Sequence, residues 1–65
     1  MRDIGRIVKV CGKIAEEWEK TCPDWRFLQL MSNFIYWLGS DGFYFEDEEF
    51  LKRFEKFMES LRGEL

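Results

Sequence analysis

The 65-residue sequence lacks histidine and contains only two cysteines and one proline. Without histidine it cannot form the Ser/His/Asp or Cys/His arrangements of nucleophilic catalysis, or a zinc site of mixed Cys and His ligands. It also contains no glycine-rich loop of the kind that cradles phosphates. These absences predict a protein that is not an enzyme and that holds no metal ion or cofactor.

The two cysteines, Cys11 and Cys22, are too few to staple a small secreted domain. If one helix ran through both, about 16 Å would separate their Cα atoms, which is well beyond the roughly 7 Å that a disulfide allows. We therefore expect two reduced thiols in a cytoplasmic protein. Cys11 lies on an apolar helix face and is predicted to be inert core, whereas Cys22, at a helix start, could have a lowered pKa.

No stretch approaches the roughly 20 apolar residues of a membrane span, and the N-terminus lacks the apolar segment of a signal peptide. The net charge of -3 argues against a general nucleic-acid binder, which needs a basic excess to displace counterions. The sequence therefore predicts no membrane association, and its charge disfavours a nucleic-acid partner.

The composition is rich in apolar residues: 46% of the side chains are hydrophobic and 18% are aromatic. A chain of this composition and length folds as one domain with a thin core. Apolar residues recur at helical spacing in three segments, at about 3–20, 23–38 and 47–62. The sequence therefore predicts an all-α fold, a compact three-helix domain spanning residues 1–65.

The first helix has an apolar stripe with the spacing 3, 1, 3, 3, 1, 3, typical of an amphipathic helix. Gly5 and Gly12 border this stripe and either allow another backbone to approach closely or simply weaken the helix. The members of the stripe are Ile4, Ile7, Val8, Cys11, Ile14, Ala15 and Trp18.

The second helix is predicted to begin at Pro23, since proline is favoured at the first helical position. Its apolar residues cover about half of its circumference, which is more than one partner helix can bury. We therefore expect it to be the central helix, packed against both others. Gly39 is placed for a left-handed C-cap, and the third helix carries acid-first pairs such as Glu49 with Arg53.

Three aromatics, Phe43-Tyr44-Phe45, precede four acids at 46–49. Successive helical residues point about 100° apart, so the four acids cannot converge on one ion, and we interpret them as a first turn that complements the helix dipole. A docking surface for a basic partner stays open. If the three aromatics are extended, Phe43 and Phe45 face the core and Tyr44 faces out, or the reverse. A hydrophobic staple between Phe45 and Phe50 requires Glu46, not Asp47, as the N-cap.

Two polar lines are candidate interaction sites. On the second helix, tyrosine, tryptophan and arginine, the types enriched at interface hot spots, point to partner binding. The alternative is a plain solvent face with Arg26 paired to one of the acids at 46–49. On the first helix, a solvated face is favoured over binding of an acidic partner or phosphate. The first line is Arg26, Gln29, Asn33 and Tyr36, flanked by Trp25 and Trp37; the second is Arg2, Arg6, Lys9 and Lys13.

The order of these motifs resembles a family of small uncharacterised proteins from bacteria and their phages. The shared pattern is a tryptophan, here Trp18, then P-D-x-R-x-x-Q-L at 23–30 and D-x-F-Y-x-E-D at 41–47, and it spans about residues 4–58. A weaker similarity to YihD-like proteins of enteric bacteria is confined to the first of these segments. The resemblance implies an all-α fold and a bacterial or phage origin, but no activity.

The combined hypothesis is a non-enzymatic protein-interaction module of phage or prophage origin that binds a host or phage protein. The alternatives are an inhibitor of a bacterial defence system, a small-molecule or nucleotide sensor with a pocket beside Arg26 and Gln29, and a structural homodimer. The predicted partner-binding residues are Trp25, Arg26, Gln29, Asn33, Tyr36, Trp37 and Tyr44.

Overall fold

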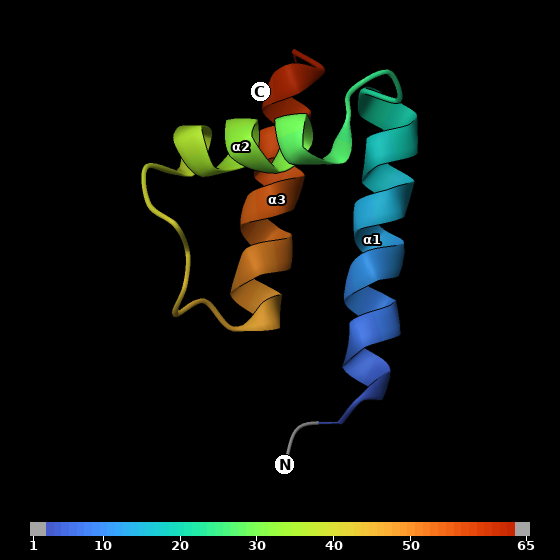
Figure 1. Ribbon diagram of the computed structural model, residues 1–65, viewed down its shortest axis with the longest axis vertical. Coiled ribbons are helices and arrows are strands. Elements are labelled where there is room, and N and C mark those ends of the chain that lie inside the picture. Colours follow the sequence, from blue (N-terminus) through green and yellow to red (C-terminus); the bar gives the residue numbers. More distant parts are fainter. Residues whose placement is uncertain (1–2, 64–65) are drawn as a thin grey trace.

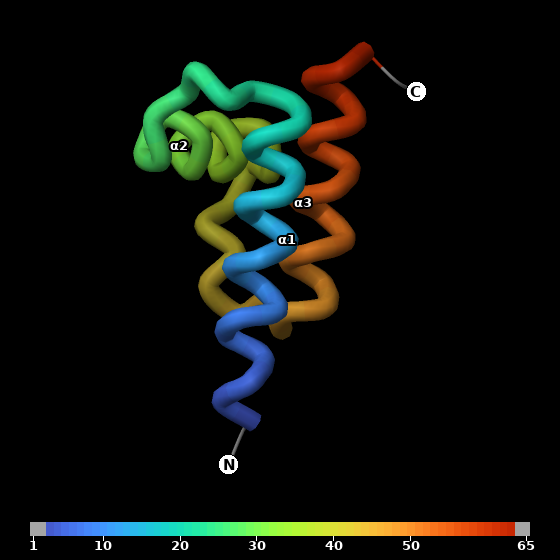
Figure 2. Tube along the Cα trace, turned by 90° about the vertical axis from the view of Figure 1, so that its right-hand side faces the viewer, coloured from blue at the N-terminus to red at the C-terminus, as the bar shows by residue number. Residues whose placement is uncertain are grey.

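The computed structural model describes residues 3–63, which form three helices and no strand: α1 (Gly5–Thr21), α2 (Phe27–Leu38) and α3 (Asp47–Leu61). The prediction of an all-α three-helix domain is confirmed. α1 and α3 run side by side, and α2 crosses in front of α3 near its C-terminal end (Figures 1 and 2). No described helix has the length and apolar character needed to cross a membrane.

The prediction that the second helix is central is wrong, because α3 is the helix whose backbone lies against both others. The short turn after α1 sends α2 across the end of the α1/α3 pair instead of along it (Figure 1). α2 therefore reaches α1 only through side chains, such as the Trp18 and Phe27 rings, whose centroids lie 5.8 Å apart.

The core lies between α2 and α3, and half of its buried residues are phenylalanines. Phe34 of α2 packs edge-on against three rings of α3, those of Phe50, Phe54 and Phe57, with centroids 5.5–5.6 Å away. Each such pair contributes about 0.5–1.5 kcal/mol beyond the area it buries. From α1, only Ile14 and Trp18 pack against this cluster, so α1 adds little to the apolar core. The buried hydrophobic residues are Cys22, Leu30, Phe34, Phe54, Phe57 and Met58.

The predicted start of the second helix at Pro23 is also wrong, because α2 begins at Phe27. Pro23 and the residue after it occupy the middle of a turn, which the Trp25 N–H closes by donating to the Cys22 carbonyl at 3.1 Å. Arg26 is the N-cap, and its backbone N–H donates to Oε1 of Gln29 at 3.3 Å. This hydrogen bond joins the N-cap to the side chain of the third helical residue, and it fixes the start of α2.

The turn is held against α1 by one further hydrogen bond. Nε1 of Trp18 donates to the carbonyl of Trp25 at 3.0 Å. Cys22 has a φ of −147°, outside the helical region, because the ring of the following proline disfavours a helical conformation at this position.

The segment between α2 and α3 turns at two glycines. Gly39 ends α2 in the left-handed conformation, which confirms the predicted cap, and Gly42 also has a positive φ. The Phe45 N–H donates back to the Gly42 carbonyl at 2.9 Å, so residues 42–45 form a tight turn and not an extended piece. The predicted alternation along 43–45 is therefore wrong: Phe43 and Tyr44 are both exposed, and only Phe45 is half-buried.

α3 begins where the sequence predicts, with Asp47, Glu48 and Glu49 in its first turn. Glu46 is the N-cap, which places Phe45 and Phe50 at the two positions of a hydrophobic staple. The predicted pair of Glu49 with Arg53 is confirmed at 2.6 Å.

Candidate functional site

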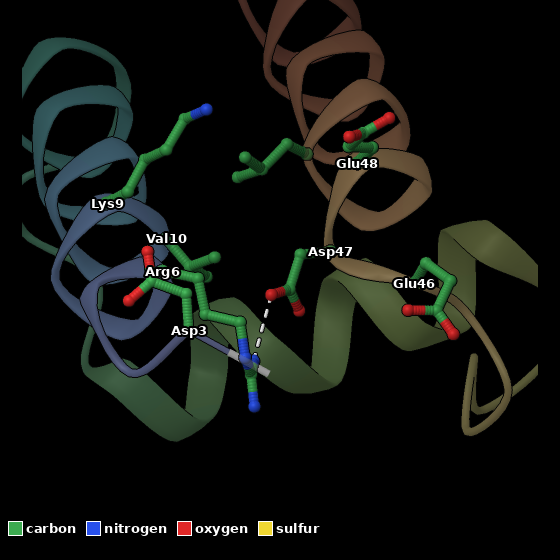
Figure 3. A pocket seen from close by; sticks show the side chains of 8 residues that line it. Asp3, Arg6, Lys9, Val10, Glu46, Asp47 and Glu48 are labelled. Atoms are coloured by element: carbon green, nitrogen blue, oxygen red, sulfur yellow. Dashed lines mark hydrogen bonds and ion pairs between the residues drawn. The ribbon is translucent and has the colours of Figure 1, made fainter. Parts of the chain in front are cut away.

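The face that α1 turns toward α3 is polar. Nη1 of Arg6 donates to Oδ2 of Asp47 at 2.9 Å, which ties the two helix starts together (Figure 3). Further along, Nζ of Lys13 lies 3.6 Å from a carboxylate oxygen of Glu55. Spaced by about two helical turns, these pairs form a ladder of ions between α1 and α3, not a hydrophobic seam.

The ladder ends at Glu17, which is only 2% exposed. Nη1 of Arg62 lies 3.3 Å from one carboxylate oxygen of Glu17, and the Nζ atoms of Lys13 and Lys20 lie 3.5 and 3.6 Å from the other. The same guanidinium donates to Oγ1 of Thr21 at 2.7 Å.

Burial alone would raise the pKa of the Glu17 carboxyl, but the hydrogen bond from Arg62 and the two lysine charges outweigh it and lower this pKa. Glu17 is therefore a buried anion that three cations hold in its charged form. The spacing to Lys13 and Lys20 is visible in the sequence, but its third partner, Arg62, is 45 residues away. No local pattern could reveal that contact.

Because α1 docks through its polar line, much of its apolar stripe faces away from the core. Ile4 is 77% and Val8 76% exposed. The prediction that Cys11 is core is wrong, because its side chain is exposed. We call the exposed part of this face, which includes the N-cap residue, the α1 stripe; it consists of Ile4, Ile7, Val8, Cys11 and Ala15.

The predicted polar line of the second helix is the outer face of α2. Its residues Gln29, Asn33 and Tyr36 are all exposed, and Tyr36 is 89% exposed. At one edge, Trp37 is 40% exposed while its ring stacks on Phe34 with centroids 6.2 Å apart. The apolar residues Leu28 and Ile35 are exposed along the other edge. We use "α2 outer face" for these six residues: Leu28, Gln29, Asn33, Ile35, Tyr36 and Trp37.

Two residues of the predicted site have structural tasks at the start of α2. Trp25 is half-buried against the core and accepts the hydrogen bond from Trp18. Arg26 is exposed and forms the N-cap. The alternative prediction paired Arg26 with one of the acids at 46–49. In the structure Asp47 pairs with Arg6 of α1 and Glu49 pairs with Arg53, so neither of these two acids is the partner of Arg26.

Tyr44 does not join the α2 outer face. The chain after α2 runs away from that helix to the start of α3 (Figure 1). The Tyr44 ring is 90% exposed and lies against that of Phe43, with centroids 5.0 Å apart. Tyr44 instead borders a shallow hollow beside the first-turn acids of α3 and Lys52. The predicted site therefore separates into two surfaces.

The basic line of the first helix is largely an internal feature. Arg2 lies outside the described residues. Arg6 and Lys13 face the acids of α3, as described above, so two members of the line are already neutralised. Of the three described members, Arg6 and Lys13 are therefore paired with acids, and Lys9 is exposed.

A cavity of about 430 Å³ opens between the starts of α1 and α3 (Figure 3). Its wall combines four acids with two cations and two apolar side chains, so acidic side chains outnumber basic ones. No cluster of three or more metal-ligating side chains occurs within residues 3–63. The lining residues are Asp3, Arg6, Lys9, Val10, Glu46, Asp47, Glu48 and Leu51.

Neither cysteine is placed as a nucleophile. Both thiols are free. Burial raises the pKa of the Cys22 thiol, which is the opposite of the lowering that its place beside a helix start suggests. Cys22 is a core residue, and no histidine exists to activate either thiol.

Comparisons with family models, with curated proteins and with solved structures found no match to this chain. The resemblance to small bacterial and phage proteins therefore stays a prediction.

Proposed function

We propose that this chain is a non-enzymatic protein-interaction module that binds a partner protein through the α2 outer face. The observation that carries the proposal is Tyr36, a large aromatic residue that is 89% exposed in the last turn of α2. Its position in a rigid helix fixes the ring at low entropic cost, which suits a binding anchor.

The surroundings of Tyr36 support this proposal. Leu28 is 74% exposed on one side of the face, and Trp37 is partly exposed on the other. A small domain rarely leaves several large apolar residues together on one surface unless another molecule covers them. Between them, the amides of Gln29 and Asn33 offer donors and acceptors that orient a partner. An aromatic anchor with polar groups around it is the usual composition of a binding hot spot.

The setting is part of the same proposal. Following the resemblance to bacterial and phage proteins, we infer a phage or prophage origin and action in the bacterial cytoplasm. The partner is then a host or phage protein, for which a defence factor is one candidate. A sensor role has less support, because Arg26 and Gln29 line neither the cavity between α1 and α3 nor the hollow beside Tyr44.

Affinity capture from a bacterial lysate tests the proposal with three baits. The wild-type chain and Lys56→Ala, an exposed change on α3, should retain the same protein, and Tyr36→Ala should lose it. Binding of the purified candidate to the three chains then measures the effect, and Tyr36→Ala should weaken it at least tenfold. Equal binding by Tyr36→Ala and wild type would rule out the α2 outer face as the site.

A further inference from the structure

We propose that a second copy of this chain covers the α1 stripe, with the two α1 helices antiparallel about a twofold axis that passes between Ile7 and Val8. The proposal concerns a different surface from the α2 outer face. Evidence against the proposed function would therefore not contradict it.

The first argument is the way in which α1 docks. Its ion pairs with α3 and with the C-cap residue Arg62 run through Arg6, Lys13 and Glu17, so the charged line of the helix faces the inside of the molecule. Ile7 and Val8 are 52% and 76% exposed as a result. An amphipathic helix normally buries its apolar face, and here the chain itself leaves that face uncovered.

The second argument is the symmetry of the stripe. A twofold contact places the same patch on both subunits, so the patch must complement itself when it is reversed. The exposed residues Ile4, Ile7, Val8 and Cys11 are spaced 3, 1, 3, which reads the same in both directions. About an axis between residues 7 and 8, Ile4 lies level with Cys11 of the second copy. Ile7 and Val8 lie on opposite sides of the contact line, so each meets its own counterpart beside the axis.

The third argument is charge. Viewed down the helix, the sector from Ile7 to Val8 that contains the α1 stripe carries no charged side chain between positions 4 and 15. The nearby cations Arg6 and Lys13 are held by acids of α3, so they do not repel a second α1. An antiparallel pair also sets the two helix dipoles against each other, which is the favourable orientation.

The fourth argument is access. α2 lies to one side of the α1/α3 layer and covers only its end near the C-terminus of α1 (Figure 2). Trp18 and Ile14 are already packed there against the core. An axis between residues 7 and 8 uses only the uncovered N-terminal half of α1, so both copies can approach without displacing α2.

The size of the contact sets the expected strength. A standard interface buries about 800 Å² on each partner, which would be about 15% of the 5236 Å² surface of this chain. A contact centred on four side chains is smaller than that, and small interfaces are weak. We therefore expect a dissociation constant on the order of micromolar.

Sedimentation equilibrium of the purified chain tests the dimer. Wild type and Tyr36→Lys, an equally exposed change on the α2 outer face, should dimerise alike, and Val8→Lys should raise the dissociation constant at least tenfold. Val8→Lys should keep the helical circular dichroism of wild type, because Val8 is exposed. A wild-type chain that is monomeric up to about 1 mM would overturn the proposal.

Cysteine crosslinking tests the geometry on a Cys11→Ser background. Val8→Cys places two thiols beside the axis and should form an intermolecular disulfide. Ala15→Cys is the matched control on the same stripe, and its two copies would lie about 22 Å apart along the helices, so it should not crosslink. Crosslinking of both variants would indicate parallel helices, and crosslinking of neither would show that no α1 pair forms; either result contradicts the proposal.

Discussion

Glu17 shows how one residue determines which face of a helix packs inside the protein. A carboxylate in the interior is costly unless charged partners surround it, and here Arg62, Lys13 and Lys20 do so. Once Glu17 faces α3, the rest of its line on α1 must face α3 as well. The apolar side chains a quarter-turn away are then left at the surface.

Replacing Glu17 by glutamine should lower the free energy of unfolding at neutral pH by about 1–3 kcal/mol, because three cations lose their common anion. Urea denaturation measures the change. Glu16→Gln alters an exposed acid on the same helix and should change stability by less than about 0.5 kcal/mol. Equal losses in the two variants would mean that the burial of Glu17 has no energetic consequence.

The same carboxylate gives the protein an acid sensitivity. Its pKa is lower in the folded state than the ordinary value of 4.5, so the unfolded chain takes up its proton first as the pH falls. The contribution of Glu17 is therefore complete above about pH 4.5 and is lost as the pH drops through the lowered pKa. Denaturation of Glu17→Gln between pH 7 and 3 should show a shallower decline than wild type; parallel curves would contradict this assignment.

At the scale of elements, the sequence predicts the positions of the helices better than it predicts which face of each helix is buried. Apolar spacing identifies all three helices, and Gly39 and the acids at 47–49 mark ends that the structure confirms. The start of α2 was missed because proline can serve a turn as well as a helix start. Here the Trp18–Trp25 hydrogen bond and the return bond from Gln29 favour the turn, and only the second of these has a local sequence signal.

The docking face of α1 could not be predicted from the sequence for a different reason. The apolar stripe and the charged line are both complete, and either could have met α3. The choice depends on Asp47, Glu55 and Arg62, each of which is 41 or more residues away from its partner on α1. The candidate site divides in the same way: helical spacing places Gln29, Asn33 and Tyr36 on one face correctly, but spacing alone cannot place Tyr44 of a separate turn.

Gly12 offers a test at the level of one helix. Beyond its own helical turn, a Cβ added there would meet no atom of residues 3–63 within 4 Å, so no other backbone in this range approaches it. Gly12→Ala should therefore stabilise the fold by about 0.5–1 kcal/mol, through the higher helix propensity of alanine. Gly39→Ala is the contrasting control and should destabilise, because its φ of +80° strains any residue with a side chain. Thermal unfolding distinguishes the two, and a destabilised Gly12→Ala would indicate a contact that the isolated chain does not show.

At the scale of the whole molecule, stability and recognition use different side chains. The core between α2 and α3 holds the fold through Leu30, Phe34 and Phe54, which are almost wholly inaccessible. The α1 stripe and the α2 outer face contain large apolar residues that the same core does not cover. We infer that the second set serves contacts with other molecules, and that its loss should leave the folded chain intact.

The most direct measurement is the free energy of unfolding of Tyr36→Ala, determined beside Phe34→Ala on the opposite face of the same helix. Tyr36→Ala should lie within about 0.5 kcal/mol of wild type, whereas Phe34→Ala should lose about 3–5 kcal/mol. A loss of about 2 kcal/mol or more in Tyr36→Ala would show that its ring stabilises the fold, and it would contradict the account of the α2 outer face as a surface reserved for a partner.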